Sequence, residues 1–238
     1  MDTSDPTGTA VGAVRASARD HLAVALDVDD VVVAMRLAAE VQPYFRVAKV
    51  GLELYSAAGP DAVGALVAMG YDVFCDLKLH DIPNTVGRAA RVIGALGATY
   101  LTIHTSGGSD MVRAGCEGFA EGAANAGLPA PIALGVTVLT SDSDAGPLPA
   151  RLRTALESGC GGVVCAASDL AQVRSIAPRL MTVVPGIRPV GSDHGDQARV
   201  ATPSEALEAG ADLLVIGRPV TAADDPLAAA AEILESLG

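Results

Sequence analysis

Residues 71–85 read YDVFCDLKLHDIPNT, and this stretch decides how the rest of the chain is interpreted. An apolar run from Tyr71 to Cys75 is followed by Asp76 and Lys78, and then by Asp81. If the run is a β-strand, Asp76 and Lys78 project from the same face, because side chains alternate with a period of two. Asp81 then lies in the loop beyond the strand. Such charges are costly to build at a strand end unless they have a function. A lone Asp-x-Lys is more simply an ion pair at the rim of a sheet, so the other strands must decide.

Apolar runs of the same kind recur along the whole chain. They are rich in Val, Ile and Leu, as strands buried on both faces should be. Eight strand-then-helix units predict an α/β protein, a single (β/α)8 (TIM) barrel with its active site at the C-terminal ends of the strands. The predicted strands are His21–Asp27, Arg46–Gly51, Asp72–Asp76, Thr99–His104, Pro131–Leu139, Gly161–Ala166, Met181–Pro185 and Asp212–Gly217.

Start and stop signals predict helices between these strands. Gly59-Pro60 opens one helix and Gly70 follows its end. Thr202, with Glu205 three residues later, has the pattern of a capping box. Further helices are predicted at Asp29–Gln42, Thr85–Leu96, Ser168–Ile176 and Pro226–Leu237.

An open doubly wound sheet is the main alternative to a barrel. It would usually show a glycine-rich dinucleotide turn after the first strand. Here that strand leads into Ala-Leu-Asp-Val-Asp-Asp (residues 25–30), without glycine. No long Gly/Ser-rich or Pro-rich linker divides the chain, so we expect one barrel domain at residues 20–238. Residues 1–19 are expected to be a flexible lead-in.

Composition excludes several classes of function. Half of the 238 residues are apolar but only 3 % are aromatic, so Val, Leu, Ile and Ala must build the core. The net charge of −12 argues against a nucleic-acid or anionic-membrane partner. No apolar run is long enough to span a membrane and no secretory signal is evident. The four cysteines and four histidines show no metal-ligand spacing, so buried free thiols in a reducing cytoplasm are expected, and no metal site.

Polar residues lie at the ends of several predicted strands. Lys49 stands between Ala48 and Val50 in a run that should be buried, so it needs a partner, either Asp27 or Asp76. Asp27 alone is equally well explained as a cap for the next helix. A ring of such residues at one end of a barrel favours a functional site over scattered rim ion pairs. Its members are Asp27, Lys49, Asp76, Lys78, Asp81, Thr140, Arg188 and Arg218.

The last two strand ends have the features of a phosphate site. Barrels often bind phosphate with the loops after strands seven and eight. Gly217 allows a ligand to approach the backbone closely, and Arg188 and Arg218 offer forked donors to phosphate oxygens. The polar, glycine-bearing segment 189–199 is interpreted as a closing lid from which Gln197 adds a donor. The alternative for that segment is a solvated surface loop.

The segment Asp76–Thr85 resembles the signature of the orotidine 5′-phosphate decarboxylase family. A bare Asp-x-Lys-x-x-Asp is shared with related sugar-phosphate decarboxylases and synthases on the same barrel, whereas the Ile-Pro-Asn-Thr extension is specific. The resemblance extends from residue 21 to about residue 230. It includes, in the family's order, Leu26-Asp27, Lys49–Gly51, Leu139–Ser141, Pro185–Arg188, Asp196-Gln197 and Ile216–Arg218.

The resemblance implies that the chain converts orotidine 5′-phosphate to UMP and CO₂, a step of de novo pyrimidine synthesis, without metal or organic cofactor. It implies that Lys78 is the catalytic lysine, with Asp76 beside the substrate carboxylate and Lys49 and Asp81 completing the catalytic set. It also implies a cytoplasmic homodimer in which Asp81 and Thr85 reach the neighbouring subunit's site. The implied substrate-binding residues are Asp27, Lys49, Thr85, Thr140, Arg188, Gln197, Gly217 and Arg218.

Two other functions stay open from the sequence. The chain is alternatively a related barrel enzyme, such as a 3-keto-gulonate 6-phosphate decarboxylase or a hexulose-phosphate synthase, both of which use Mg²⁺. It is alternatively a barrel that binds a phosphate ligand without catalysis. A chelator distinguishes the first alternative, and tolerance of the loss of Lys78 distinguishes the second.

Overall fold

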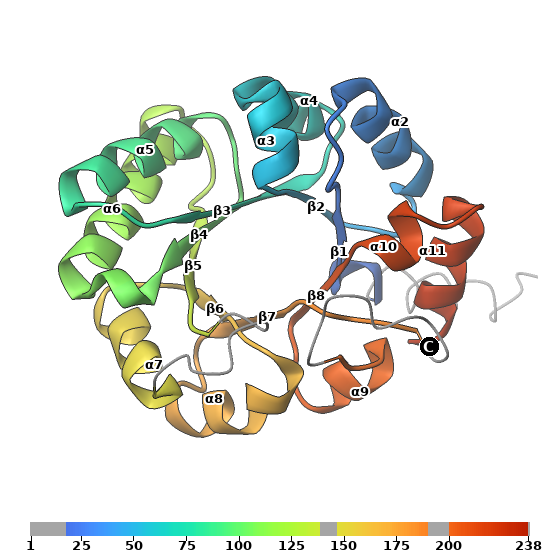
Figure 1. Ribbon diagram of the computed structural model, residues 1–238. Coiled ribbons are helices and arrows are strands. Elements are labelled where there is room, and N and C mark those ends of the chain that lie inside the picture. Colours follow the sequence, from blue (N-terminus) through green and yellow to red (C-terminus); the bar gives the residue numbers. More distant parts are fainter. Residues whose placement is uncertain (1–17, 139–146, 190–199, 238) are drawn as a thin grey trace, which may run out of the picture.

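The computed structural model describes residues 18–138, 147–189 and 200–237. Eight parallel strands form a closed barrel in chain order, with β1 paired to both β2 and β8 (Figure 1). The predicted barrel is therefore confirmed. The strands are β1 Leu22–Ala25, β2 Val47–Val50, β3 Asp72–Leu79, β4 Tyr100–His104, β5 Ile132–Val136, β6 Gly162–Val164, β7 Met181–Val184 and β8 Leu213–Ile216.

Helices surround the ring of strands (Figure 1). The helix predicted to begin at Thr85 begins at Pro83, because proline fits the first helical turn. The capping box is present: the Thr202 amide donates to Glu205 Oε2 at 2.9 Å. The helices are α2 Val31–Val41, α3 Leu52–Ala58, α4 Pro60–Ala68, α5 Pro83–Ala95, α6 Ser109–Asn125, α7 Leu148–Glu157, α8 Leu170–Ile176, α9 Pro203–Glu208, α10 Arg218–Thr221 and α11 Pro226–Glu235, with 3₁₀ turns η1 Thr105–Gly107 and η2 Ala167–Asp169.

The core has two parts, one between strands and helices and one inside the barrel. The inner part is filled largely by small and branched side chains, as the composition predicts. The three phenylalanines of the chain, Phe45, Phe74 and Phe119, are all buried. Phe74 points into the barrel and meets the edge of Tyr100, with ring centroids 6.1 Å apart. Inside-facing residues of the barrel thus form a packed floor beneath the strand ends.

Three polar residues are bonded to one another at the N-terminal ends of the strands, opposite the end where the sequence predicts the site. We call them the strand-start cluster: Arg174, Thr182 and Asp212. Arg174 Nη2 donates to Asp212 Oδ2 at 2.6 Å, and its Nη1 donates to the Leu180 carbonyl at 3.2 Å. Thr182, fully buried at the start of β7, donates through Oγ1 to the same Asp212 oxygen at 2.9 Å. These bonds tie α8 to the starts of β7 and β8.

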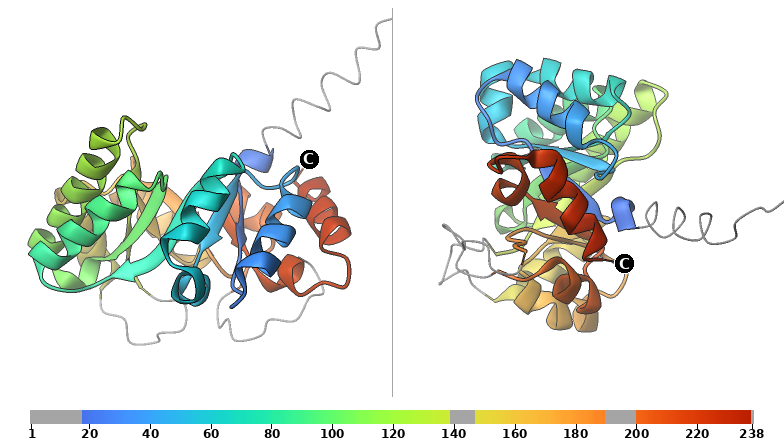
Figure 2. Two further views of the ribbon diagram at one scale, coloured as in Figure 1. Left: turned by 90° about the horizontal axis from the view of Figure 1, so that it is seen from above. Right: turned by 90° about the vertical axis from the view of Figure 1, so that its right-hand side faces the viewer.

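Helices α5 and α6 form the closest helix pair of the barrel wall. They lie side by side at the left of the barrel in Figure 1 and at the left flank of the left-hand view in Figure 2. A Cβ added at Gly118 would overlap the Gly87 carbonyl oxygen, and one added at Gly122 would overlap that of Arg91. Only glycine lets the two backbones come this close. The pair therefore holds the N-terminus of α5, which follows the Asp81 loop, in a fixed place.

Other expectations are met in part. All four cysteines are free thiols; Cys75, Cys160 and Cys165 are buried as predicted, whereas Cys116 is half-buried. Burial raises the pKa of the Cys75 thiol to about 12, with a smaller contribution from Asp76. None of the helices described is long and apolar enough to cross a membrane. The predicted lead-in, up to residue 17, lies outside the described residues.

Candidate active site

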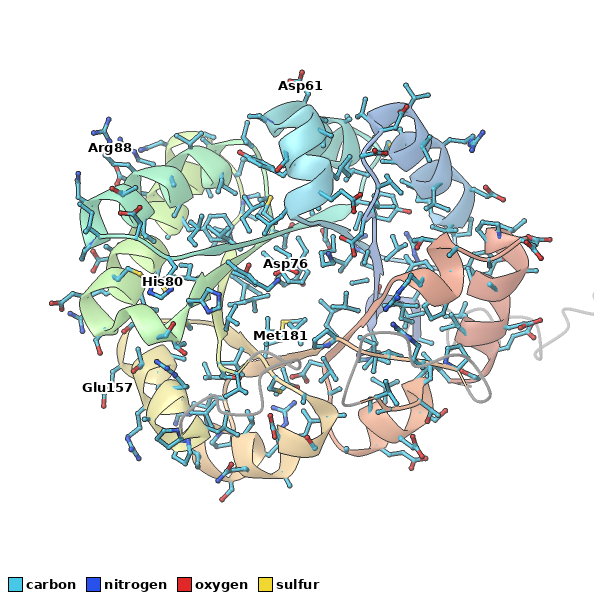
Figure 3. All side chains as sticks on the ribbon, viewed as in Figure 1. Asp61, Asp76, His80, Arg88, Glu157 and Met181 are labelled. Carbon is cyan, nitrogen blue, oxygen red and sulfur yellow. The ribbon has the colours of Figure 1, made fainter. Side chains whose placement is uncertain are left out.

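Four charged residues form one chain of ion pairs at the C-terminal ends of β1, β2 and β3, and we call them the strand-end cluster: Asp27, Lys49, Asp76 and Lys78. Lys49 Nζ lies 2.8 Å from Asp27 Oδ1 and 3.7 Å from Asp76 Oδ2. Lys78 Nζ lies 2.7 Å from Asp76 Oδ1. Figure 3 shows Asp76 inside the ring of strands, whereas Asp61, Arg88 and Glu157 point away from it. The predicted partners of Lys49 are confirmed, both of them.

Asp27 does not cap the next helix. The N-cap of α2 is Asp30, whose Oδ1 accepts hydrogen bonds from the Val32 and Val33 amides. Asp27 instead forms the shorter of the two ion pairs of Lys49, which is 94 % buried and whose charge needs carboxylate partners. Gly51 makes room for this pair, since a Cβ there would overlap Asp27 Oδ1. The glycine after β2 is thus part of the site.

The backbone at Lys78 departs from a regular strand. Lys78 has φ 50°, and it is the one non-glycine residue in the described chain with a positive φ. The pairing of β3 with β4 shifts register between Cys75 and Leu79. β3 therefore continues past Asp76, where the sequence predicted its end, but in irregular form. A left-handed lysine costs about 1–2 kcal/mol, and such strain clusters at functional sites.

Asp76 is held as a carboxylate. Burial alone would raise its pKa, but the positive charges of Lys49 and Lys78 and hydrogen bonds from Lys78 and Thr102 outweigh burial. The net result is a pKa below the ordinary value. A fixed negative charge therefore stands beside the Lys78 ammonium.

A cavity of about 480 Å³ opens over the strand-end cluster. β3 and β7 are opposite each other in a ring of eight, so the cavity has Lys78 on one side and the loops after β7 and β8 on the other. Apolar side chains form much of its wall. It is lined by Ala25, Asp27, Lys49, Glu53, Phe74, Asp76, Lys78, Val136, Val138, Val164, Cys165, Val183, Pro185, Gly186, Arg188, Val215, Gly217 and Arg218.

The far side of the cavity carries the two predicted arginines. Arg188 is 92 % buried and its Nη1 donates to the Ile187 carbonyl at 2.9 Å. Its amide donates to the Ala201 carbonyl at 2.9 Å, so the two ends of the segment between them are joined. Arg218 begins α10 directly after Gly217. Two guanidinium groups next to glycines suit an anionic oxygen group.

Some predicted residues are not brought to this cavity. Asp81 and Thr85 are exposed and, in the described chain, do not line it. Asp81 Oδ1 accepts from the Ile82 amide at 2.6 Å. Thr140 and Gln197 lie outside the described residues. Within one chain the site therefore unites seven predicted residues: Asp27, Lys49, Asp76, Lys78, Arg188, Gly217 and Arg218.

Two polar residues near the site, Glu53 and Thr102, were not among the predicted site residues. Glu53, on α3, lines the cavity, and the helix that carries it was not predicted. Thr102, on β4, donates to Asp76 Oδ1 at 3.1 Å and accepts from the Lys78 amide at 2.9 Å. A threonine in the apolar run of β4 was the available signal, but its partners depend on the register between strands. Within the described ranges no three His, Cys, Asp or Glu side chains gather as a metal site.

Comparisons with known proteins agree with this geometry. Residues 20–233 match the model of the orotidine 5′-phosphate decarboxylase / HUMPS family. The chain is 44 % identical to orotidine 5′-phosphate decarboxylase of Moorella thermoacetica and 47 % identical to that of Thermobifida fusca, covering 92 % and 91 % of this chain and 93 % and 95 % of those proteins. A crystal structure of the Lactobacillus acidophilus enzyme of that name matches with a TM-score of 0.77 and 35 % identity, over 91 % of this chain and 98 % of that one. The chain belongs to the orotidine 5′-phosphate decarboxylase / HUMPS family.

Proposed function

We propose that this protein is a carboxy-lyase that converts orotidine 5′-phosphate to UMP and CO₂. The observation that carries the proposal is the alternating chain Asp27–Lys49–Asp76–Lys78, which faces Arg188 and Arg218 across one cavity. The named relatives at 44 % and 47 % identity support it. A substrate with an anionic ring at one end and a phosphate at the other fits this distribution of charge.

Lys78 is the proposed acid. Breaking the bond between C6 and the carboxylate leaves CO₂ and an electron pair in the plane of the pyrimidine ring, where the ring does not delocalise it. An ammonium group next to C6 stabilises that charge and donates its proton to form the new C–H bond. The neutral amine then recovers a proton from water. Asp76 keeps Lys78 oriented through the contact of 2.7 Å.

Asp76 has a second proposed role. Its ionised carboxylate, in contact with Lys78, is proposed to lie beside the substrate carboxylate, and two neighbouring like charges repel each other. The repulsion is relieved when CO₂ leaves. Lys49 and Asp27, at the other end of the ion-pair chain, are the proposed contacts to the ribose hydroxyls.

The arginines are the proposed phosphate site. Arg188 and Arg218 bind phosphate oxygens, and Gly217 lets the backbone approach them. Binding energy gained there, away from C6, holds the ring against Lys78. Gln197 and Thr140, which belong to segments outside the described residues, remain proposed contacts to the phosphate and the pyrimidine.

We also propose a homodimer in which Asp81 and Thr85 complete the partner's site. Their exposure, and their absence from the lining of the cavity in the described part of their own chain, support this. Ile82, between them, is 64 % exposed, as expected of an apolar side chain that a second copy covers. The free thiols of all four cysteines support the cytoplasm as its compartment. We treat residues 20–238 as one domain.

The assay of the reaction is direct. The purified protein is mixed with orotidine 5′-phosphate in excess EDTA, and the loss of the orotate ultraviolet band is followed. Decarboxylation to UMP that does not depend on metal is expected. Activity that EDTA abolishes, or no loss of the band with folded protein, would contradict the proposal and favour a Mg²⁺-dependent sugar-phosphate reaction.

The shared site is tested by mixing two inactive variants, Lys78→Ala and Asp81→Ala. In a heterodimer one site lacks both groups and the other has both. Random exchange of equal amounts makes half of the dimers mixed, so about one quarter of wild-type activity is expected. Each variant alone is the control. No recovery, with subunit exchange demonstrated by mass spectrometry of labelled chains, would refute the contribution of Asp81 in trans.

A further inference from the structure

Thr102 is a buried polar residue that touches the catalytic machinery without touching the cavity. It lies in the middle of β4 with no exposed surface, and it is not among the residues that line the cavity. Its hydroxyl donates to Asp76 Oδ1 at 3.1 Å and accepts from the Lys78 amide at 2.9 Å. A hydroxyl has one proton to donate and two lone pairs, so it can make both bonds at once.

The bond to the Lys78 amide falls where the backbone most needs a fixed partner. Between Cys75 and Leu79 the ladder from β3 to β4 is interrupted, and Lys78 has φ 50°. A lysine adopts that conformation only when its surroundings hold it. Thr102 supplies an acceptor on the neighbouring strand at this interruption. The direction in which the Lys78 side chain leaves the backbone therefore depends on Thr102.

The bond to Asp76 acts on the other side of the same ion pair. Asp76 Oδ1 receives both the Lys78 ammonium, at 2.7 Å, and the Thr102 hydroxyl. The hydroxyl thus fixes the rotation of the carboxylate as well as the peptide of the lysine. One side chain sets the geometry of both members of the pair.

We propose that Thr102 is a positioning residue for the decarboxylation, which holds Lys78 in its left-handed backbone conformation and orients Asp76 against it. The inference rests on the proposed function. It predicts a loss in the chemical step rather than in substrate binding, because the arginines across the cavity are untouched. A misplacement of about 1 Å in a reacting group can cost about 100-fold in rate.

Two substitutions separate this role from simple packing. Thr102→Val keeps the shape and removes the hydroxyl, whereas Thr102→Ser keeps the hydroxyl and removes a methyl group. We expect kcat to fall about 10- to 100-fold in Thr102→Val with KM changed less than about twofold. Thr102→Ser should retain kcat within about threefold of the wild type. Equal kcat in Thr102→Val and wild type, or equal losses in Val and Ser, would overturn the proposal.

Thr182→Val is the matched control. Thr182 is also fully buried on a strand and bonded through its hydroxyl to an aspartate, Asp212, but at the opposite end of the barrel. It should lower the melting temperature while leaving kcat unchanged. If Thr182→Val lowers kcat as much as Thr102→Val does, general destabilisation explains both and the proposal fails. Should Thr102→Val not fold, Thr102→Ala replaces it, compared with Thr102→Ser.

A measurement that does not depend on activity separates the positioning role of Thr102 from the proposed decarboxylase function. A crystal structure of the variant without the hydroxyl should show φ of Lys78 outside the left-handed region, or Lys78 Nζ no longer bonded to Asp76 Oδ1. An unchanged Lys78 and Asp76 would overturn the positioning role whatever the reaction is. A wild-type protein that does not decarboxylate orotidine 5′-phosphate would refute the proposed function, and the crystal structure would still decide whether Thr102 positions Lys78.

Discussion

The two ends of the barrel carry similar groups of residues with different partners. The strand-start cluster joins an arginine, an aspartate and a buried threonine, and the strand-end cluster joins two lysines and two aspartates with Thr102 beside them. Arg174 is bonded to carbonyls of Gly210 and Leu180 as well as to Asp212, so its donors go to the fold itself. The ammonium groups of the two lysines in the strand-end cluster are instead paired with carboxylates, and both lysines line a cavity.

The difference shows what makes an ionic group a candidate for catalysis. In the strand-start cluster, backbone carbonyls accept the donors of the arginine, so the cluster stabilises the fold. The strand-end cluster lines a cavity, so its charges can interact with a ligand. This division agrees with the general rule that the C-terminal face of a barrel reacts and the N-terminal face stabilises. Substitutions at the two ends should accordingly have opposite consequences.

The largest effect is expected for Lys78→Ala. It removes the proton donor and the stabilising charge together, so kcat should fall by at least about 10⁴-fold. The melting temperature should change little, because Asp76 keeps Lys49 at 3.7 Å. Steady-state kinetics and a thermal melt check both parts. A near-normal kcat would show that Lys78 is not the proton donor and that the strand-end cluster is not the catalytic group.

Arg218→Ala should affect binding more than chemistry. Loss of a hydrogen bond between charged groups costs about 1.5–3 kcal/mol, or about 10- to 100-fold in kcat/KM, expressed mainly in KM. Orotidine, which lacks the phosphate, is the control substrate, and its kcat/KM should be the same in variant and wild type. An equal loss for both substrates would mean that Arg218 does not act through phosphate.

Arg174→Ala should reverse the pattern of Lys78→Ala. It removes the guanidinium donors from the Leu180 and Gly210 carbonyls and from Asp212, which keeps only its bonds from Thr182, so the free energy of unfolding should fall by about 1–3 kcal/mol. The folded fraction should keep its kcat. Urea denaturation measures the first and kinetics the second, with the exposed Arg36→Ala as control. A strong loss of kcat would show that the two ends of the barrel are not independent.

The smallest effect is expected from pH. The pKa of Asp76 is lower in the folded protein than its ordinary value of about 3.9. Its ionised form therefore stabilises the fold above about pH 4, and this contribution is lost as the pH falls through the folded value. The difference in unfolding free energy between wild type and Asp76→Asn should be constant from about pH 7 to 5 and shrink below about pH 4. A difference that grows on acidification would contradict the assigned shift.

The barrel was predictable from the sequence because each strand is a short, separate apolar run. Seven of the eight strands fall within their predicted ranges, and β3 extends past its predicted end to Leu79. The irregular part of β3 was not predictable, because it depends on how β3 pairs with β4. For the same reason the contact between Thr102 and Lys78 has no signal in either segment alone. α3, which carries Glu53, was missed because it is short and lies directly after β2.

The ion pairs were partly predictable. A buried lysine needs a carboxylate, and that argument alone named Asp27 and Asp76 for Lys49. The alternative for Asp27, a helix cap, fails because Asp30 lies closer to the first turn of α2. The roles of Asp81 and Thr85 follow from no contact within one chain and stay predictions about a dimer.

The close packing of α5 on α6 has a consequence for engineering. Replacing a glycine inside a helix by alanine usually raises the free energy of unfolding by about 0.5–1 kcal/mol. A stabilisation strategy based on helix propensity alone would therefore choose Gly118 and Gly122 for substitution by alanine. At both positions the new methyl group would run into a carbonyl oxygen of α5 and push away the helix that follows the Asp81 loop. Gly64 on α4 has nothing within 4 Å of its added Cβ. The same substitution that damages the molecule on one flank would be a safe first choice for a more heat-resistant variant on another.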